Sequence, residues 1–328
     1  MLQSKQLSNY STMGPEQLEE LIQRLGQSYV GNRLMLQAHH SSKVYGGRGR
    51  LRFHPENSET LPLLIKYGLF LAGMTKRCRN NCLNYRIREH VFHFKNLPAA
   101  FHGLRILQLS DIHADAIPDG CHKLKKVIDK LHGRYDLCVL TGDYRFQTSR
   151  EYQTCLEKMQ FLTESISCSY GIYGILGNHD FLEMVHGLEN MGIRMLLNES
   201  VPLENQGQRI WIAGVDDPHF YHVHDIPWAM QHIPSKSFSI LLCHSPEACR
   251  QASFAGVDVY LCGHTHGGQM CLPGGIPVIT NSSVSRKYSA GDWSLDRMQG
   301  YTSRGCGASG LPARLNCPPE INLHILKG

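Results

Sequence analysis

The stretch LRILQLSDIH (residues 104–113) holds an apolar run that ends in Ser110, Asp111 and His113. Its length and its Leu and Ile content indicate a buried β-strand followed by a polar loop. Helical spacing of apolar residues follows at 121–131 and 152–163. Further apolar runs of strand length lie at 137–141, 172–176, 210–213, 238–243 and 257–261. Alternating strands and helices predict a layered α/β domain.

Polar clusters follow the ends of these runs and supply seven candidate metal ligands. Loops beyond the carboxyl ends of strands form the functional crevice of an α/β domain, so the clusters are expected to converge. Carboxylate, imidazole and amide oxygen suit Mn²⁺, Fe²⁺, Zn²⁺ or Mg²⁺. Seven ligands are too many for one ion and suit two ions that share a carboxylate. The candidates are Asp111, His113, Asp143, Asn178, His244, His264 and His266.

The order Asp-x-His, Gly-Asp, Gly-Asn-His-Asp, His and Gly-His-x-His resembles the signature of the calcineurin-like metallophosphoesterases. Residues 96–111, 267–269, 303–305 and 318–321 are similar to one branch of that family, the YkuE-like phosphoesterases. The resemblance extends from about residue 97 to residue 328. It implies an α/β fold of two facing β-sheets flanked by helices, a four-layer sandwich.

The same resemblance implies different roles for the site residues. His179 would stay off the metals and donate a proton or hydrogen bond to a substrate oxygen, oriented by Asp180. A hydroxide shared by two ions, with Mn²⁺ the expected metal, would attack phosphorus. One ion would take Asp111, His113, Asp143 and His266, and the other Asp143, Asn178, His244 and His264, with Asp143 bridging.

The expected activity is that of a metal-dependent phosphodiesterase or pyrophosphohydrolase. The YkuE-like branch includes membrane-associated enzymes, among them a UDP-2,3-diacylglucosamine pyrophosphohydrolase of lipid A synthesis, and this lipid nucleotide is the expected substrate. Two alternatives stay open: a soluble nucleotide or nucleic-acid phosphodiesterase, and a non-catalytic scaffold of the same fold. Nucleic acid is not an expected partner, because the sequence lacks interleaved aromatic and basic residues.

Two arginines are candidate contacts to the substrate. Arg145 follows the Gly-Asp-Tyr motif and could bind a phosphate bidentately, with a surface salt bridge as the alternative. Arg304 could bind a head group. The segment that contains Asp216, Asp217 and His219 is expected to be a solvated loop, with a lid over the cleft as the alternative.

Charge divides the 328-residue chain into two parts. Residues 1–100 hold 14 Lys and Arg, 6 Glu and no Asp, whereas the rest of the chain is slightly acidic. We therefore expect a basic N-terminal extension over 1–95 and a catalytic domain over 96–328. Within the extension, residues 61–74 are apolar except for Lys66 and precede several arginines. This stretch is too short to span a bilayer, and it predicts either a membrane-interfacial helix or a helix packed on the main domain.

Twelve cysteines occur without a Cys-x-x-Cys pair, and several lie inside apolar runs. This pattern favours buried free thiols in a reducing compartment. The first 25 residues are polar and do not resemble a signal peptide. A cytoplasmic protein, peripheral on the inner face of the cell membrane, is the expectation.

Overall fold

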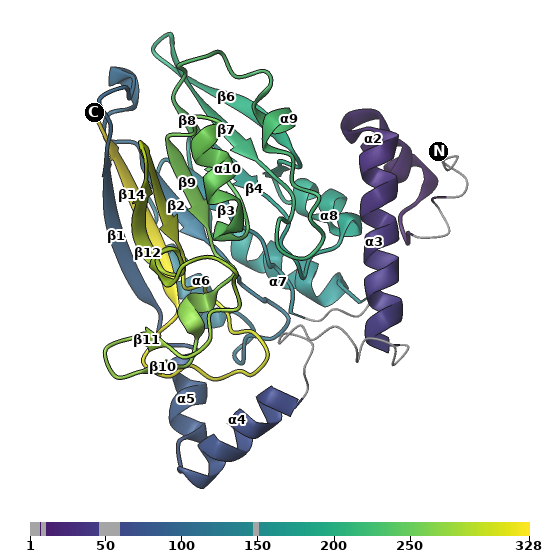
Figure 1. The fold of residues 1–328 in the computed structure, drawn as a ribbon, viewed down its shortest axis with the longest axis vertical. Coiled ribbons are helices and arrows are strands. Elements are labelled where there is room, and N and C mark those ends of the chain that lie inside the picture. Colours follow the sequence, from purple (N-terminus) through teal and green to yellow (C-terminus); the bar gives the residue numbers. More distant parts are fainter. Residues whose placement is uncertain (1–6, 8–10, 46–59, 147–150) are drawn as a thin grey trace.

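A computed structural model describes residues 7, 11–45, 60–146 and 151–328, and two six-stranded sheets form its centre (Figure 1). The order of the first sheet is β1 (Arg86–His93), β14 (Glu320–Lys327), β2 (Arg105–Leu109), β3 (Leu137–Leu140), β4 (Ile172–Gly174) and β5 (Ile193–Met195). The order of the second is β12 (Gly291–Leu295), β13 (Met298–Thr302), β9 (Val259–Cys262), β8 (Ser239–Leu242), β7 (Gln208–Gly214) and β6 (Glu199–Asn205). The expected pair of facing sheets is confirmed.

Alternation along the strands explains why the sheets stack face to face. In β2, Ile106 packs into the core between the sheets, whereas Leu107 and Leu109 belong to the core beneath the helices. In β9, Leu261 faces the other sheet and Tyr260 faces away from it. Each of these strands is therefore buried on both faces, which is why its sequence is mostly apolar.

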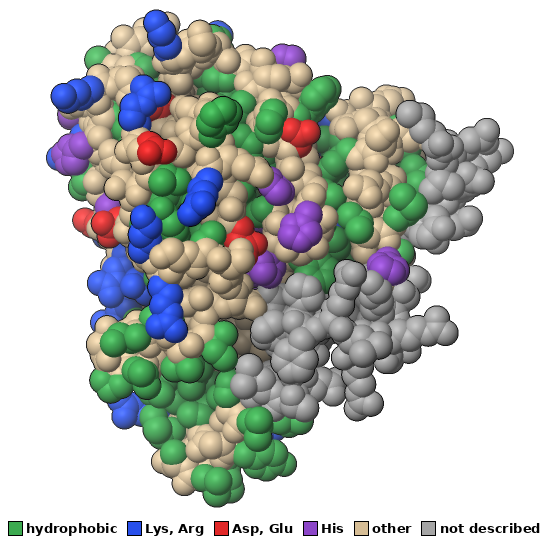
Figure 2. Space-filling view, viewed as in Figure 1, with side chains coloured by type: hydrophobic (Ala, Val, Ile, Leu, Met, Phe, Trp, Pro, Cys, Tyr) green, Lys and Arg blue, Asp and Glu red, His purple; other side chains and the backbone are tan. Residues whose placement is uncertain are grey.

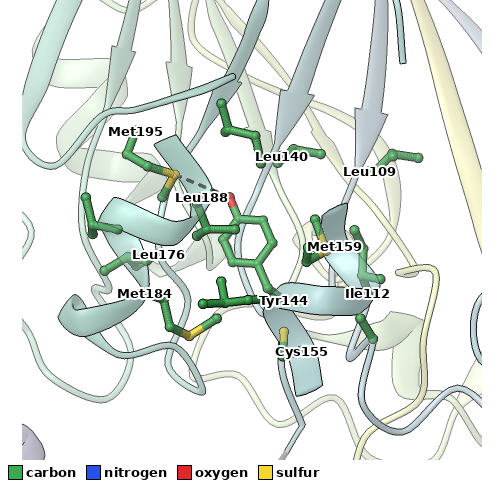
Figure 3. Close-up of a cluster of buried hydrophobic side chains, with 14 of the residues drawn as sticks. Leu109, Ile112, Leu140, Tyr144, Cys155, Met159, Leu176, Met184, Leu188 and Met195 are labelled. Carbon is green, nitrogen blue, oxygen red and sulfur yellow. Dashed lines mark hydrogen bonds between the residues drawn. The ribbon is translucent and has the colours of Figure 1, made fainter. Parts of the chain in front are cut away.

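Helices cover the outer face of each sheet and complete the four layers. The first sheet is covered by α6 (His122–Asp129), α7 (Gln153–Thr163) and α8 (Val185–Asn190), and the second by α9 (Ile226–Met230) and α10 (Cys249–Phe254). Figure 3 shows the core under the first layer, where Tyr144 lies among Leu140, Met159 and Met195. The helices expected at 121–131 and 152–163 are confirmed as α6 and α7.

Short 3₁₀ turns and one small hairpin lie in the connections. The turns are η4 (Ala99–Phe101), η5 (Leu182–Met184), η6 (Pro246–Ala248), η7 (His266–Gly268) and η8 (Arg286–Tyr288). The hairpin pairs β10 (Cys271–Leu272) with β11 (Ile276–Pro277). It directly follows η7, which contains an expected metal ligand.

The first two described helices pack on the catalytic body. They are α2 (Pro15–Leu25) and α3 (Gln27–Tyr45), and their Leu18, Leu21 and Leu34 are buried in the same core as β2. Strand β1 belongs to the first sheet, ahead of the expected boundary at 95–96. The basic N-terminal third thus contributes both a core-packed helical pair and an edge strand.

The predicted helix over 61–74 is observed as α4 (Thr60–Leu71), followed by α5 (Thr75–Asn81). Leu69 is buried and Ile65 is half-buried, and both pack near Ala313 and Met270. The other large apolar side chains described in α4 are exposed. No helix in the described ranges has the length and apolarity needed to cross a membrane.

Candidate metal centre

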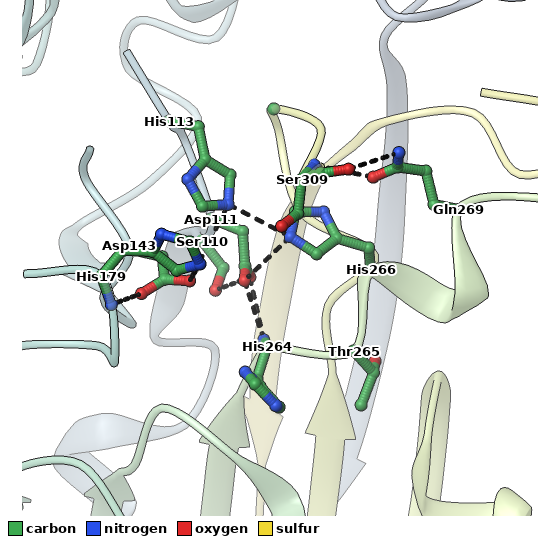
Figure 4. Close-up of polar contacts among 12 residues, drawn as sticks. Ser110, Asp111, His113, Asp143, His179, His264, Thr265, His266, Gln269 and Ser309 are labelled. Atoms are coloured by element: carbon green, nitrogen blue, oxygen red, sulfur yellow. Dashed lines mark hydrogen bonds and ion pairs between the residues drawn. The ribbon is translucent and has the colours of Figure 1, made fainter. Parts of the chain in front are cut away.

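Loops after five parallel strands of the two sheets bring the candidate ligands to one edge of the sandwich (Figure 4). Asp111 and His113 follow β2, and Asp143 follows β3. From the other strands come Asn178 after β4, His244 after β8, and His264 and His266 after β9. All seven side chains are buried.

The first group that could hold a metal ion comprises Asp111, His113 and His266. One ligand atom of each lies within 4.8 Å of the others. The Nε2 atoms of His113 and His266 are 3.2 Å apart, and Nε2 of His266 is 3.5 Å from Oδ1 of Asp111. Two imidazole nitrogens and a carboxylate oxygen thus converge on one point.

The second group comprises Asp143, His244 and His264, again with one ligand atom of each within 4.8 Å of the others. Asn178 joins it, because its Oδ1 lies 3.0 Å from Nε2 of His244 and 3.0 Å from Nδ1 of His264. Oδ2 of Asp143 lies 3.3 Å from His244 Nε2 and 3.8 Å from His113 Nε2, a member of the first group. Asp143 therefore stands between the groups, where a shared ligand belongs.

Backbone carbonyls fix the tautomers of three of these histidines. Nδ1 of His113 lies 2.8 Å from the carbonyl of Arg145, and Nδ1 of His244 lies 2.8 Å from that of Thr141. Nε2 of His264 lies 3.0 Å from the carbonyl of Asn281. A carbonyl only accepts, so each of these nitrogens carries a proton and the opposite nitrogen of the ring is the one that faces the site.

This arrangement fits a pair of cations. The Nδ1 lone pair of His264 faces the amide oxygen of Asn178, which also only accepts. Lone pairs that meet with no proton between them are satisfied by a positive ion. The oxygen and imidazole donors suit a borderline or hard divalent ion.

Burial and close charges shift the pKa values of the carboxyl groups in opposite directions. Burial raises the pKa of Asp111 to about 6, helped by the nearby Asp143 charge and opposed by His244. Burial acts the same way on Asp143, but His244 and His179 outweigh it and hold its pKa well below the usual range. Burial also lowers the pKa of His113 to about 4, so this imidazole stays neutral near pH 7. Neutral imidazole is the form that binds metals.

Several ligand residues have an unusual backbone conformation. Asp111, His113, Asp143, His264 and His266 have φ between 47° and 70°, the left-handed region that few non-glycine residues occupy. Such strain persists where the surroundings fix it, and it clusters at functional sites. Gly263 and Gly177 permit the close approach, because an added Cβ would come within 2.2 Å of Asp111 or Asp143 oxygen atoms.

The structure corrects the expected contact between Asp180 and His179. Nδ1 of His179 lies 2.8 Å from the carbonyl of Phe146, and its Nε2 lies 4.0 Å from Oδ2 of Asp143. The Asp180 carboxylate instead accepts hydrogen bonds from the backbone amides of Asp143, Tyr144, Arg145 and Gly177. A carboxylate satisfies several converging amides at once, so Asp180 shapes the loop that carries Asp143.

Arg145 is a buried residue, and the surface salt bridge considered for it is wrong. Its side chain is fully buried, and its guanidinium lies 3.6 Å from the ring centroid of Phe181. Its Nε donates to the carbonyl of His179 at 2.5 Å. These contacts connect Arg145 to the His179 loop, on which the position of the His179 ring depends.

Arg304 is partly exposed beside the metal groups. Its Nη1 forms an ion pair of 2.9 Å with Glu320, and its side-chain carbons lie against Gly267, next to His266.

The prediction of a solvated loop after β7 is wrong for Asp216 and Asp217, the first residues of that segment. Asp216 and Asp217 are fully buried, and Asp217 accepts hydrogen bonds from three following backbone amides. The ring centroid of His219 lies 4.1 Å from that of His264, with the two rings tilted, and Nδ1 of His219 pairs with Glu247 at 2.9 Å. The Glu247 carboxylate in turn accepts hydrogen bonds from the backbone amide and the hydroxyl of Ser283. Ser283 lies two residues after Asn281, whose carbonyl accepts a hydrogen bond from His264.

Sequence reasoning missed three residues that hold the ligands in place: Glu247, Asn281 and Arg314. The Arg314 guanidinium is fully buried, donates to the carbonyl of Gly307 at 2.6 Å, and lies 3.2 Å from Nδ1 of His266. A short spacing could have flagged Glu247, which stands three residues after His244. No local pattern points to Asn281 or Arg314, because their roles arise from folding.

Facing sheets with two buried ligand groups, and Asp143 between the groups, are typical of a metal-dependent phosphoesterase. The family model described as calcineurin-like phosphoesterase matches residues 104–268, and the chain belongs to this family. The protein is a hydrolase of phosphoester bonds, and its family uses a binuclear divalent metal centre.

Individual relatives support the same assignment. The chain is 30% identical to the metallophosphoesterase YkuE of Bacillus subtilis, over 73% of this chain and 84% of that one. It is 34% identical to YpbG of the same organism, over 78% and 93%, and 28% identical to the phosphodiesterase YaeI of Escherichia coli, over 72% and 86%.

Proposed function

We propose that this protein hydrolyses a phosphodiester or pyrophosphate bond with two divalent ions, Mn²⁺ being the expected metal. The observation that carries the proposal is the position of Asp143, whose Oδ2 lies near one imidazole of each ligand group. Ions bound there supply Lewis acidity, which neutralises charge on the phosphoryl oxygens. Asp111, His113 and His266 would hold one ion, Asn178, His244 and His264 the other, and Asp143 both.

His179 is the proposed proton donor. Its Nδ1–H is committed to the carbonyl of Phe146, so a proton can leave only from Nε2, which faces the metal groups. Its side chain is 13% exposed and is therefore less enclosed than the Asp143 carboxylate beside it, which is 3% exposed. A cationic imidazole at this position can protonate a leaving oxygen and then return to the neutral form.

The proposed substrate is lipid-linked, with UDP-2,3-diacylglucosamine as the specific candidate. Hydrolysis of its pyrophosphate would yield UMP and the acylated sugar phosphate. Arg304 lies close to Gly267, next to His266, and is the proposed contact to an anionic group of such a substrate. A place on the inner face of the cell membrane follows from the same proposal.

A two-stage assay tests the function. Mn²⁺-loaded protein should hydrolyse bis-p-nitrophenyl phosphate and lose the activity in chelator. It should then release UMP from UDP-2,3-diacylglucosamine in detergent micelles with a higher kcat/KM than from UDP-glucosamine, because buried acyl carbons add binding energy. Equal kcat/KM values for the two substrates would refute the lipid substrate but would not affect the assignment as a hydrolase. No turnover on any substrate with both ions bound would point to the scaffold.

A further inference from the structure

Two segments far apart in the sequence build one exposed apolar surface at the end of the molecule that carries α4 and α5. Large apolar side chains are usually buried, yet the members of this surface are 44% to 84% exposed. Figure 2 shows apolar side chains gathered at this end. We name it the end surface; α4 contributes Leu63, Leu64, Tyr67, Phe70 and Leu71, and the β10–β11 hairpin region contributes Leu272, Ile276, Val278 and Ile279.

Packing joins the two segments into one surface. Leu69 and Ile65, on the inner side of α4, belong to a small core with Met270, which directly precedes β10. Residues 311–315 complete this core through Leu311, Ala313 and Leu315. The helix and the hairpin are thus held next to each other by buried contacts.

The two segments that build the end surface carry charge of a single sign. Residues 60–88 and 259–291 contain no Asp or Glu. The exposed cations of these two segments are Lys66, Lys76, Arg77, Arg79, Arg86, Arg88, Arg286 and Lys287. An apolar patch within a cationic rim is complementary to a bilayer whose head groups are anionic.

We propose that the end surface docks the protein on an anionic lipid bilayer, with α4 lying in the plane of the interface and the β10–β11 hairpin inserted beside it. The 12 residues of α4 reach about 18 Å, less than the hydrocarbon thickness of about 30 Å. A symmetric contact with a second copy would place the cationic rims against each other, which disfavours a dimer through this surface.

The hairpin gives the docking surface a direct connection to the metal ligands. Two residues after Ile279, the carbonyl of Asn281 accepts the Nε2–H of His264 at 3.0 Å. On the other side of the hairpin, η7 contains His266 itself. A lipid head group at the hairpin therefore lies next to the ligand loops, and this part of the inference rests on the proposed function.

Vesicle flotation tests the docking. The full chain should float with vesicles of phosphatidylcholine that contain a third phosphatidylglycerol, and much less with pure phosphatidylcholine. Phe70→Asp in α4 and Ile276→Asp in β11 should each weaken the partitioning at least about tenfold, the loss expected for one large apolar side chain. Phe254→Asp in α10 is the matched control, because Phe254 is 96% exposed and lies outside the end surface. It should float like the parent chain.

Further measurements keep each result interpretable. Hydrolysis of bis-p-nitrophenyl phosphate shows that a variant is folded, so a variant that turns over but does not float supports docking. If no protein hydrolyses the diester while flotation behaves as expected, the docking stands and the proposed function fails. Flotation that is unaffected by Ile276→Asp would overturn the two-segment surface. Dimers of the parent chain that Phe70→Asp makes monomeric would assign the surface to a second copy.

Discussion

Arg33 in α3 and Asp216 after β7 form an ion pair of 2.9 Å, and both side chains are fully buried. The same guanidinium donates to the carbonyl of Asp180 at 3.0 Å and covers the ring of Tyr221. Asp216 also accepts the hydroxyl of Tyr29 at 2.5 Å. Helix α3 therefore connects two loops that surround the metal ligands.

Arg33→Met is expected to destabilise the protein by about 3–5 kcal/mol, because it leaves the Asp216 carboxylate buried without its cation. Adding Asp216→Asn removes that charge and should restore part of the loss. Urea unfolding of the three proteins measures both effects. An Arg33→Met variant within about 1 kcal/mol of the parent would show that the pair contributes little.

Asp143→Asn should weaken both metal sites together, because the shared carboxylate loses its charge. Metal analysis should show a fall from roughly two ions per chain to below one, with loss of diester hydrolysis. The exposed Asp129→Asn serves as the control and should keep both ions. Retention of two ions and of turnover in Asp143→Asn would contradict the shared-ligand assignment.

His179→Ala should keep both ions and lose turnover by roughly 10²–10⁴, the usual contribution of a general acid. The imidazole donates to the Phe146 carbonyl and is not a ligand in this assignment. Metal analysis and steady-state rates on the same preparation separate the two effects, and the exposed His132→Ala is the control. A collapse in metal content would make His179 a ligand.

Buried His324 in β14 predicts acid sensitivity that does not depend on the metal ligands. Burial, with a contribution from His90, lowers its pKa to about 3, and its Nε2 lies 2.8 Å from the amide oxygen of Gln108. Below pH 6.5, about the ordinary pKa of histidine, His324 is protonated in the unfolded chain but stays neutral in the folded chain. The free energy of unfolding therefore falls as the pH drops from about 6.5 towards 3.

His324→Gln should remove this acid sensitivity. Between pH 7 and 4.5 the parent should lose about 2–3 kcal/mol more stability than the variant. Denaturant unfolding at the two pH values measures the difference, and exposed His132→Gln should behave like the parent. Equal losses in parent and variant would mean that His324 is protonated in the folded state.

The two-sheet core was predictable because its strands are apolar on both faces. Residues 104–110 and 137–141 are mostly apolar, and β2 and β3 follow them closely. Strand β1 was not predictable in the same way. Most of its side chains are exposed, and Arg86, Arg88 and Glu89 made it read as part of a basic extension.

The ligands themselves were predictable because each lies in a short motif after a strand. The residues that hold them come from distant positions: His219 meets Glu247 across 28 residues, and Arg314 meets His266 across 48. Asp180 shows a second limit. Asp180 directly follows His179 in the motif, yet the Asp180 carboxylate faces the backbone amides of the Asp143 loop. The turn at Gly177 gives the carboxylate this direction.

The position of β14 in the first sheet has a consequence for folding during synthesis on the ribosome. Residues 320–327 lie between β1 and β2, paired with both. Until they have been synthesised, the first sheet lacks an interior strand, whereas β6 to β9 are already available to pair with one another. We expect the second sheet to form on the nascent chain and the first sheet to be completed late. A frameshift ahead of residue 320 would therefore leave the first sheet without β14, and the incompletely folded chain would be exposed to quality-control proteases.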